Sequence, residues 1–82
     1  MIMSDVHKNY LFDLGYELKQ DALDARRERD SAPMGSEDRA FKSGRLLAFY
    51  EIISTMRNRA EGFGIPLSDL RLDDIEPDRD LT

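Results

Sequence analysis

Apolar residues recur every three or four positions through the first third of the chain, the spacing that places them on one face of an α-helix. Ser4 is a favourable N-cap, and Asp5 follows in the first turn, where a carboxylate interacts well with the helix dipole. Arginines crowd the other end of the stretch, where positive charge is favoured. The pattern predicts a helix over residues 4–29. Its main apolar stripe consists of Leu11, Leu14, Leu18, Ala22 and Ala25.

This first helix also carries a second apolar face. Phe12, Tyr16 and Leu23 lie about 100–140° around the helix from Leu11, at 100° per residue. Lys8 and Lys19 separate the two faces. A single neighbouring helix covers only one face, so the second needs another partner.

A second helical pattern follows a segment rich in proline, glycine and serine, which predicts a turn at residues 30–36 and a helix at residues 37–63. Ser36 is a plausible N-cap with two acidic residues behind it, and Gly62 or Gly64 supplies the stop. The apolar residues cover about half of this helix's circumference, which is more than one neighbour can bury. They are Phe41, Leu46, Ala48, Phe49, Ile52, Ile53, Met56, Ala60 and Phe63.

The last segment, residues 65–82, is acidic but contains too many apolar residues for a solvated disordered tail. We expect an extended strap, with one short helical turn at residues 69–72, that docks on the helices. The docking residues are expected to be Leu67, Leu70, Leu72 and Ile75. The pattern leaves open whether the strap docks on its own chain or on a partner, and a frayed terminus is the alternative.

Two long helices joined by a short turn form an antiparallel hairpin. Exposed apolar surface is unfavourable by about 25 cal/mol per Å², so a second hairpin is expected to cover the surplus. The predicted fold is an all-α single domain over residues 1–82, an antiparallel two-helix hairpin plus a short C-terminal strap, dimerising to a four-helix bundle. The expected oligomer interface comprises Phe12, Tyr16, Leu23, Phe41, Ala48, Phe49, Ile52 and Met56.

The distribution of charge along the chain suggests how two hairpins are oriented in the dimer. The chain has a net charge of -5, yet basic residues concentrate around the turn between the helices. Since the acidic strap begins at the opposite end of the hairpin, we expect it to reach the turn of a partner chain rather than its own. The basic residues also form a possible anion or nucleic-acid contact, namely Arg26, Arg27, Arg29, Arg39 and Lys42.

Residues for chemistry are scarce. The chain has no cysteine, His7 is its one histidine, and it contains no glycine-rich phosphate loop or nucleophile motif. Glu17, Asp21 and Asp24 lie close on the first helix, but the second helix lacks the matching carboxylate pair that a magnesium site needs. We therefore predict no enzymatic activity, no cofactor and no metal site.

These features favour a cytoplasmic helical module for protein–protein interaction that self-associates as a homodimer and presents an acidic surface to a protein partner. No apolar run approaches the ~18 residues of a membrane span, and the first residues do not resemble a signal peptide. Two alternatives stay open. One is an acidic inhibitor of the immunity or antitoxin type that binds a basic partner. The other is a regulator that contacts nucleic acid through the turn, although the acidic balance disfavours nucleic acid as the main partner.

Overall fold

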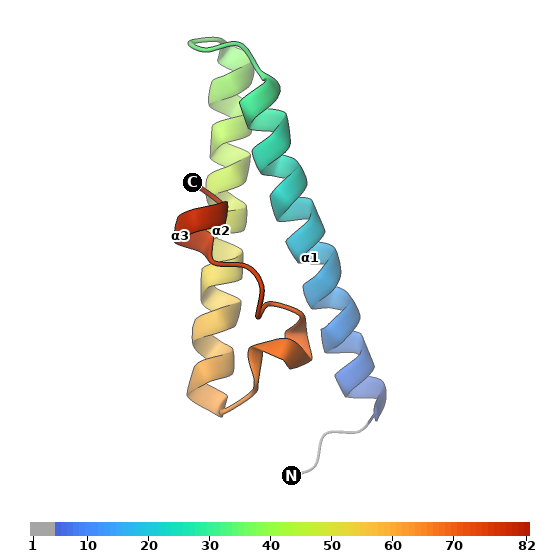
Figure 1. Ribbon diagram of the computed structural model, residues 1–82. Coiled ribbons are helices and arrows are strands. Elements are labelled where there is room, and N and C mark those ends of the chain that lie inside the picture. Colours follow the sequence, from blue (N-terminus) through green and yellow to red (C-terminus); the bar gives the residue numbers. More distant parts are fainter. Residues whose placement is uncertain (1–4) are drawn as a thin grey trace.

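The structure, a computed structural model, describes residues 5–82. Helix α1 spans Asp5–Ser31 and helix α2 spans Glu37–Phe63. A 3₁₀ turn, η1 (Leu67–Leu70), and a short helix, α3 (Pro77–Asp80), follow them. Figure 1 shows α1 and α2 as an antiparallel pair, which confirms the all-helical class and the two-helix hairpin. The predicted N-cap, Ser4, lies outside the described residues.

Local chemistry explains the turn between the helices. Helix α1 ends at Ser31, two residues beyond the predicted end, since Pro33 is the first residue that disfavours further helix. The Ser36 hydroxyl accepts the backbone N–H of Arg39 at 3.0 Å and so caps α2. The Arg39 guanidinium donates to the carbonyl oxygens of Arg29 at 3.2 Å and Ala32 at 3.0 Å. One arginine of α2 therefore satisfies carbonyls at the end of α1.

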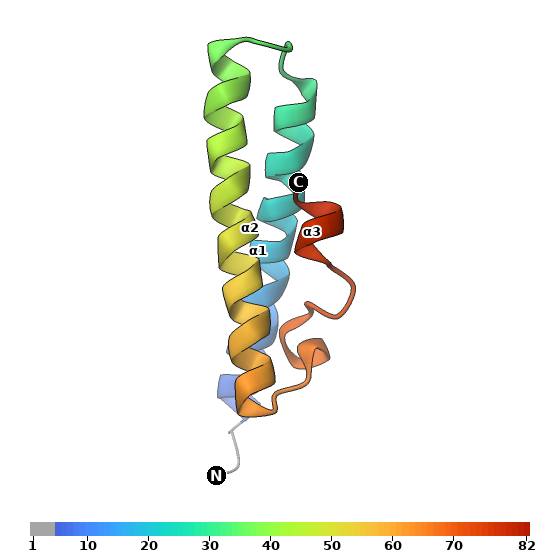
Figure 2. The same ribbon diagram turned by 90° about the vertical axis from the view of Figure 1, so that its left-hand side faces the viewer.

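The other end of α2 closes in a Schellman motif. Gly64 adopts φ 70°, which favours glycine, and its N–H donates to Glu61 O at 3.0 Å. The N–H of Ile65 donates to Ala60 O at 2.8 Å. This motif reverses the chain and sends the strap, residues 65–82, back along the hairpin (Figures 1 and 2).

The two long helices lie close together at the turn and diverge toward the other end (Figure 1). The side chains of α1 account for this shape. Near the turn its buried stripe consists of the small residues Ala22 and Ala25, which let α2 approach. Farther along, Leu11 and Leu18 are larger and only partly buried. The wider gap at that end receives the strap.

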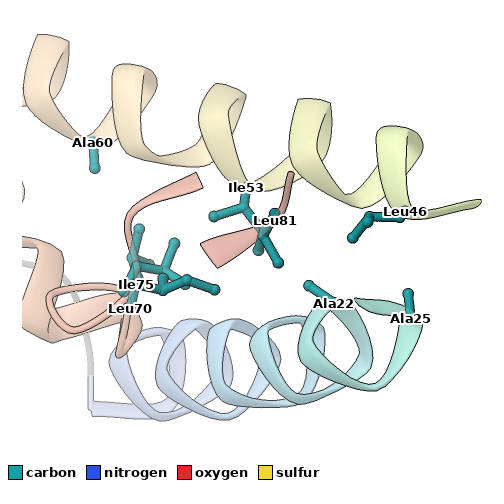
Figure 3. Close-up of a cluster of buried hydrophobic side chains, with 9 residues drawn as sticks. Ala22, Ala25, Leu46, Ile53, Ala60, Leu70, Ile75 and Leu81 are labelled. Carbon is teal, nitrogen blue, oxygen red and sulfur yellow. The ribbon is translucent and has the colours of Figure 1, made fainter. Parts of the chain in front are cut away.

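Apolar side chains of the strap complete the core. Leu70, Leu72, Ile75 and Leu81 are buried together with Ile53 of α2. Figure 3 shows strap side chains between Ile53 and Ala60 on one side and α1 on the other. Leu67 is half-buried and packs at the edge of this cluster. The strap thus docks on the helices of its own chain.

The expectation that the strap reaches only a partner's turn is wrong. The Arg26 guanidinium donates to the backbone oxygen of Asp80 at 3.0 Å, and that of Arg29 donates to Thr82 O at 3.1 Å. The strap does begin at the far end of the hairpin, but a largely extended chain of this length runs back along most of the hairpin toward the same turn.

Polar contacts hold the strap from both helices. Lys19 of α1 is buried and pairs with Asp74 at 2.8 Å. Arg57 of α2 donates to the backbone oxygens of Leu72 and Ile75 and pairs with Glu76 at 3.2 Å. These donors satisfy carbonyls in a segment that has little regular structure of its own.

Gly15 of α1 is the point where the strap backbone comes closest to a helix. A Cβ atom at this position would lie 2.8 Å from the carbonyl carbon of Leu70 and still closer to its oxygen. No larger side chain fits there unless η1 moves, because the clash is with backbone. Gly15 weakens α1 as a helix, but it is the position at which the strap backbone packs directly on α1.

We expect Gly15→Ala to destabilise the chain by about 1–3 kcal/mol, although alanine is the better helix former. Amide hydrogen exchange of residues 65–82 should accelerate, while the α1–α2 contact near the turn stays protected. Gly44→Ala is the matched control, because Gly44 lies inside α2 with open space around it. It should raise stability by about 0.8–1 kcal/mol in urea unfolding. Equal stability of the two variants would contradict this placement of the strap.

The strap contacts also predict an acid response. Lys19 lowers the pKa of Asp74 below its ordinary value of 3.8 by hydrogen bonding. Arg79 and the backbone N–H of Glu76 lower the pKa of Asp80 to about 2. The folded chain favours both carboxylates in ionised form. Their contribution to the free energy of unfolding is therefore present above pH 3.8 and is lost as the pH falls toward about 2.

We therefore expect the methyl NMR signals of Leu72 and Leu81 to move toward their random-coil positions between about pH 4 and pH 2, before the amides of α2 near the turn change. The effect should be modest, because both carboxylates are partly exposed. Asp74→Asn should weaken the response, whereas Asp73→Asn, at the exposed neighbouring position, should not. Loss of strap and turn signals in one step would contradict the expectation.

Candidate interaction surface

The strap covers much of the second apolar face of α1. The Arg71 guanidinium lies over the rings of Phe12 and Tyr16, 4.7 and 4.5 Å from their centroids. The rings stay 40% and 43% exposed, and Leu23 packs against the core. A cation over an aromatic face is a favourable contact. The α1 part of the expected interface therefore already has an intramolecular partner.

The outer face of α2, opposite its buried stripe, has no such cover. In Figure 2 the strap lies beside α2 without crossing the helix. Positions at alternating spacings of four and three residues form one line along it, the heptad pattern of a helix–helix contact. We call this line the outer seam. It comprises Phe41, Arg45, Ala48, Ile52, Thr55, Arg59 and Gly62, all of which are exposed.

The expected interface residues on α2 thus separate into two groups. Phe41 is 74% and Ile52 is 41% exposed, and both lie in the outer seam with Ala48. Phe49 and Met56 are partly buried and pack against the core. Ala48, Ile52 and Met56 line a shallow groove with Glu51 and Thr55, so the middle of the seam is concave and mainly apolar.

The cations near the turn contact their own chain. Arg26 and Arg29 hold the end of the strap, and Arg39 caps α1. Arg27 pairs with the Asp24 carboxylate, and Lys42 pairs with Asp38 at 3.0 Å. These contacts compensate the positive charge inside the fold, so the structure gives these residues structural roles.

The outer side of α1 carries a line of acidic residues at spacings of four, four, three and four. Asp13 and Glu17 are exposed, whereas Asp24 pairs with Arg27 and Glu28 with Arg45. This acidic stripe consists of Asp13, Glu17, Asp21, Asp24 and Glu28. Its negative charge would attract a basic surface, and its Glu28 end lies beside α2, where it pairs with Arg45.

The possible metal ligands of residues 5–82 are dispersed, and the buried polar side chains are paired. No group of three histidine, aspartate or glutamate side chains within this range is placed to hold a metal ion. Every buried side-chain nitrogen and oxygen there has a hydrogen-bond partner. The Tyr50 hydroxyl, in a polar cleft between α2 and the strap, donates to Asp78, and this bond raises the pKa of the tyrosine. Tyr50 is thus held in its neutral form.

Sequence reasoning missed the residues that fix the strap on the hairpin, which are Gly15, Lys19 and Arg57 on the helices and Arg71 in the strap itself. A signal for the first two was present. A glycine and a lysine beside the leucine stripe of α1 are unexpected on a surface that only packs against another helix. Arg57 and Arg71 gave no comparable signal, because an arginine on an exposed helix face or strap has the same sequence context.

Comparison with known proteins adds no assignment: no family model matches the chain, and no curated protein or solved structure gives a significant match. Within residues 5–82, neither long helix combines the length and the apolar character that a bilayer crossing requires. The surfaces of α1 and α2 are therefore the features that bear on function.

Proposed function

We propose that this chain is a non-enzymatic helical interaction module that self-associates through the outer seam of α2. The observation that carries the proposal is that the seam stays exposed after the hairpin and the strap have formed their core. Its heptad spacing and its large apolar residues, Phe41 and Ile52, suit a helix of a second copy.

The size of the seam sets the expected strength of the contact. Helix α2 has 27 residues, which corresponds to about 40 Å at 1.5 Å per residue. A stripe about 10 Å wide then offers roughly 400 Å² on each chain, or roughly 800 Å² in a pair, which lies at the low end of specific interfaces. We therefore propose a reversible dimer of micromolar affinity.

Such a pair contains four long helices but buries only the two α2 seams, so it is looser than the closed four-helix bundle that the sequence suggests. The acidic stripe of α1 lies on another helix and stays exposed in this arrangement. A basic protein would still have access to it on both chains. The proposed acidic partner surface and the self-association surface thus lie on different helices and meet at the ion pair between Glu28 and Arg45.

Ile52→Asp tests the proposal. We expect it to weaken self-association at least about 100-fold, because each dimer loses two buried isoleucines worth about 1.5–3 kcal/mol each. Sedimentation velocity from about 1 to about 500 µM should show the unmodified chain shifting from monomer to dimer and the variant remaining monomeric. The circular dichroism of the variant should be unchanged, since Ile52 lies outside the core cluster.

Leu47→Asp is the matched control. Leu47 is also an exposed apolar residue of α2, but it lies about 110° around the helix from the seam. It should leave the sedimentation series unchanged. A monomeric unmodified chain over the whole concentration range, or equal loss of association in both variants, would overturn the proposal.

A further inference from the structure

We infer that the two copies pack their α2 helices antiparallel about a two-fold axis at residue 50, an inference that rests on the proposed self-association. The seam itself suggests this centre. Positions 41 and 59, 45 and 55, and 48 and 52 are each equally distant from residue 50. Residue 50 is also the midpoint of α2 (Glu37–Phe63), so this register brings the whole of both helices into contact.

The register joins residues of complementary size. It places Ala48 opposite the partner's Ile52, and the two-fold axis repeats this contact on the other side. A small residue opposite a large one lets the helices approach while the isoleucine fills the space above the alanine. Ala48 and Ile52 already line the concave part of the seam, which has the shape that this contact needs.

The register also avoids contacts between like charges. Phe41, which is 74% exposed, lies opposite the partner's Arg59, and a guanidinium over an aromatic ring is attractive. Arg45 lies opposite the neutral Thr55 of the partner. The Arg45 charge is further compensated within its own chain by Glu28 at 3.0 Å. No layer of the seam brings two like charges together.

Other registers are less favourable. A parallel, in-register pair would stack Arg45 on the partner's Arg45 and Arg59 on the partner's Arg59, so like charges would meet in two layers. An antiparallel pair shifted by one heptad loses seven residues of overlap. In one direction of the shift Ala48 faces the partner's Arg59, and in the other it faces Arg45, so an arginine takes the place of isoleucine opposite the alanine.

Pulsed electron paramagnetic resonance on spin-labelled chains tests the register. The chain has no cysteine, so Ala40→Cys and Asn58→Cys each create a single labelling site. Both residues are exposed on α2 and lie about 90° around the helix from the seam. For an axis at residue 50, the two labels of a dimer are separated along the helix by about 30 Å at position 40 and about 24 Å at position 58.

Each alternative gives a different pair of distances. A parallel dimer puts both pairs of labels near the interhelical spacing of about 10 Å. A one-heptad shift lengthens one separation by about 10 Å and shortens the other by about 10 Å. Either result, observed for chains that sediment as dimers, would overturn the inferred register and leave the proposed self-association intact. Absence of any intermolecular dipolar signal, together with monomeric sedimentation, would overturn both.

Discussion

The close contact between the strap and α1 at Gly15 determines how the rest of the molecule is arranged. Since the backbone of Leu70 lies directly against this glycine, the strap enters between the two helices and its apolar side chains reach the core. The helices consequently diverge at this end and remain together at the turn, where alanines line α1 (Figures 1 and 3). The core is therefore made of three segments, and neither long helix is packed only against the other.

This arrangement gives the two helices different surfaces. On α1, Arg71 covers the second aromatic face, and the opposite side is acidic. On α2, the buried stripe accepts the hairpin and strap, whereas the outer seam is exposed over its whole length. Large apolar residues stay exposed on both helices, Val6 and Tyr10 of α1 among them, but the outer seam of α2 runs the length of its helix without cover from the strap. The proposed contact with a second copy rests on this exposed seam rather than on the total amount of apolar surface.

Periodicity was enough to predict the hairpin, because apolar spacing, caps and turn residues are local signals. It also indicated that the strap has apolar residues suited to docking. Two features could not be predicted from the sequence and are seen only in the three-dimensional structure. The path of the strap depends on backbone contact at Gly15 and on carbonyl recognition by Arg57, and neither leaves a periodic trace in the sequence. Likewise, the sequence left open a nucleic-acid contact at the arginines near the turn, because the strap carbonyls that accept from Arg26 and Arg29 are distant in the sequence.

The central claim is that the strap packs on the helices of its own chain, and an isotope-filtered nuclear Overhauser experiment tests it most directly. In a sample that mixes labelled and unlabelled chains, contacts between the methyl groups of Leu72 or Leu81 and that of Ile53 should arise within one chain only. The filtered spectrum, which selects contacts between chains, should lack them at every concentration. Strap-to-helix signals in the filtered spectrum would show an exchanged strap and would contradict the account.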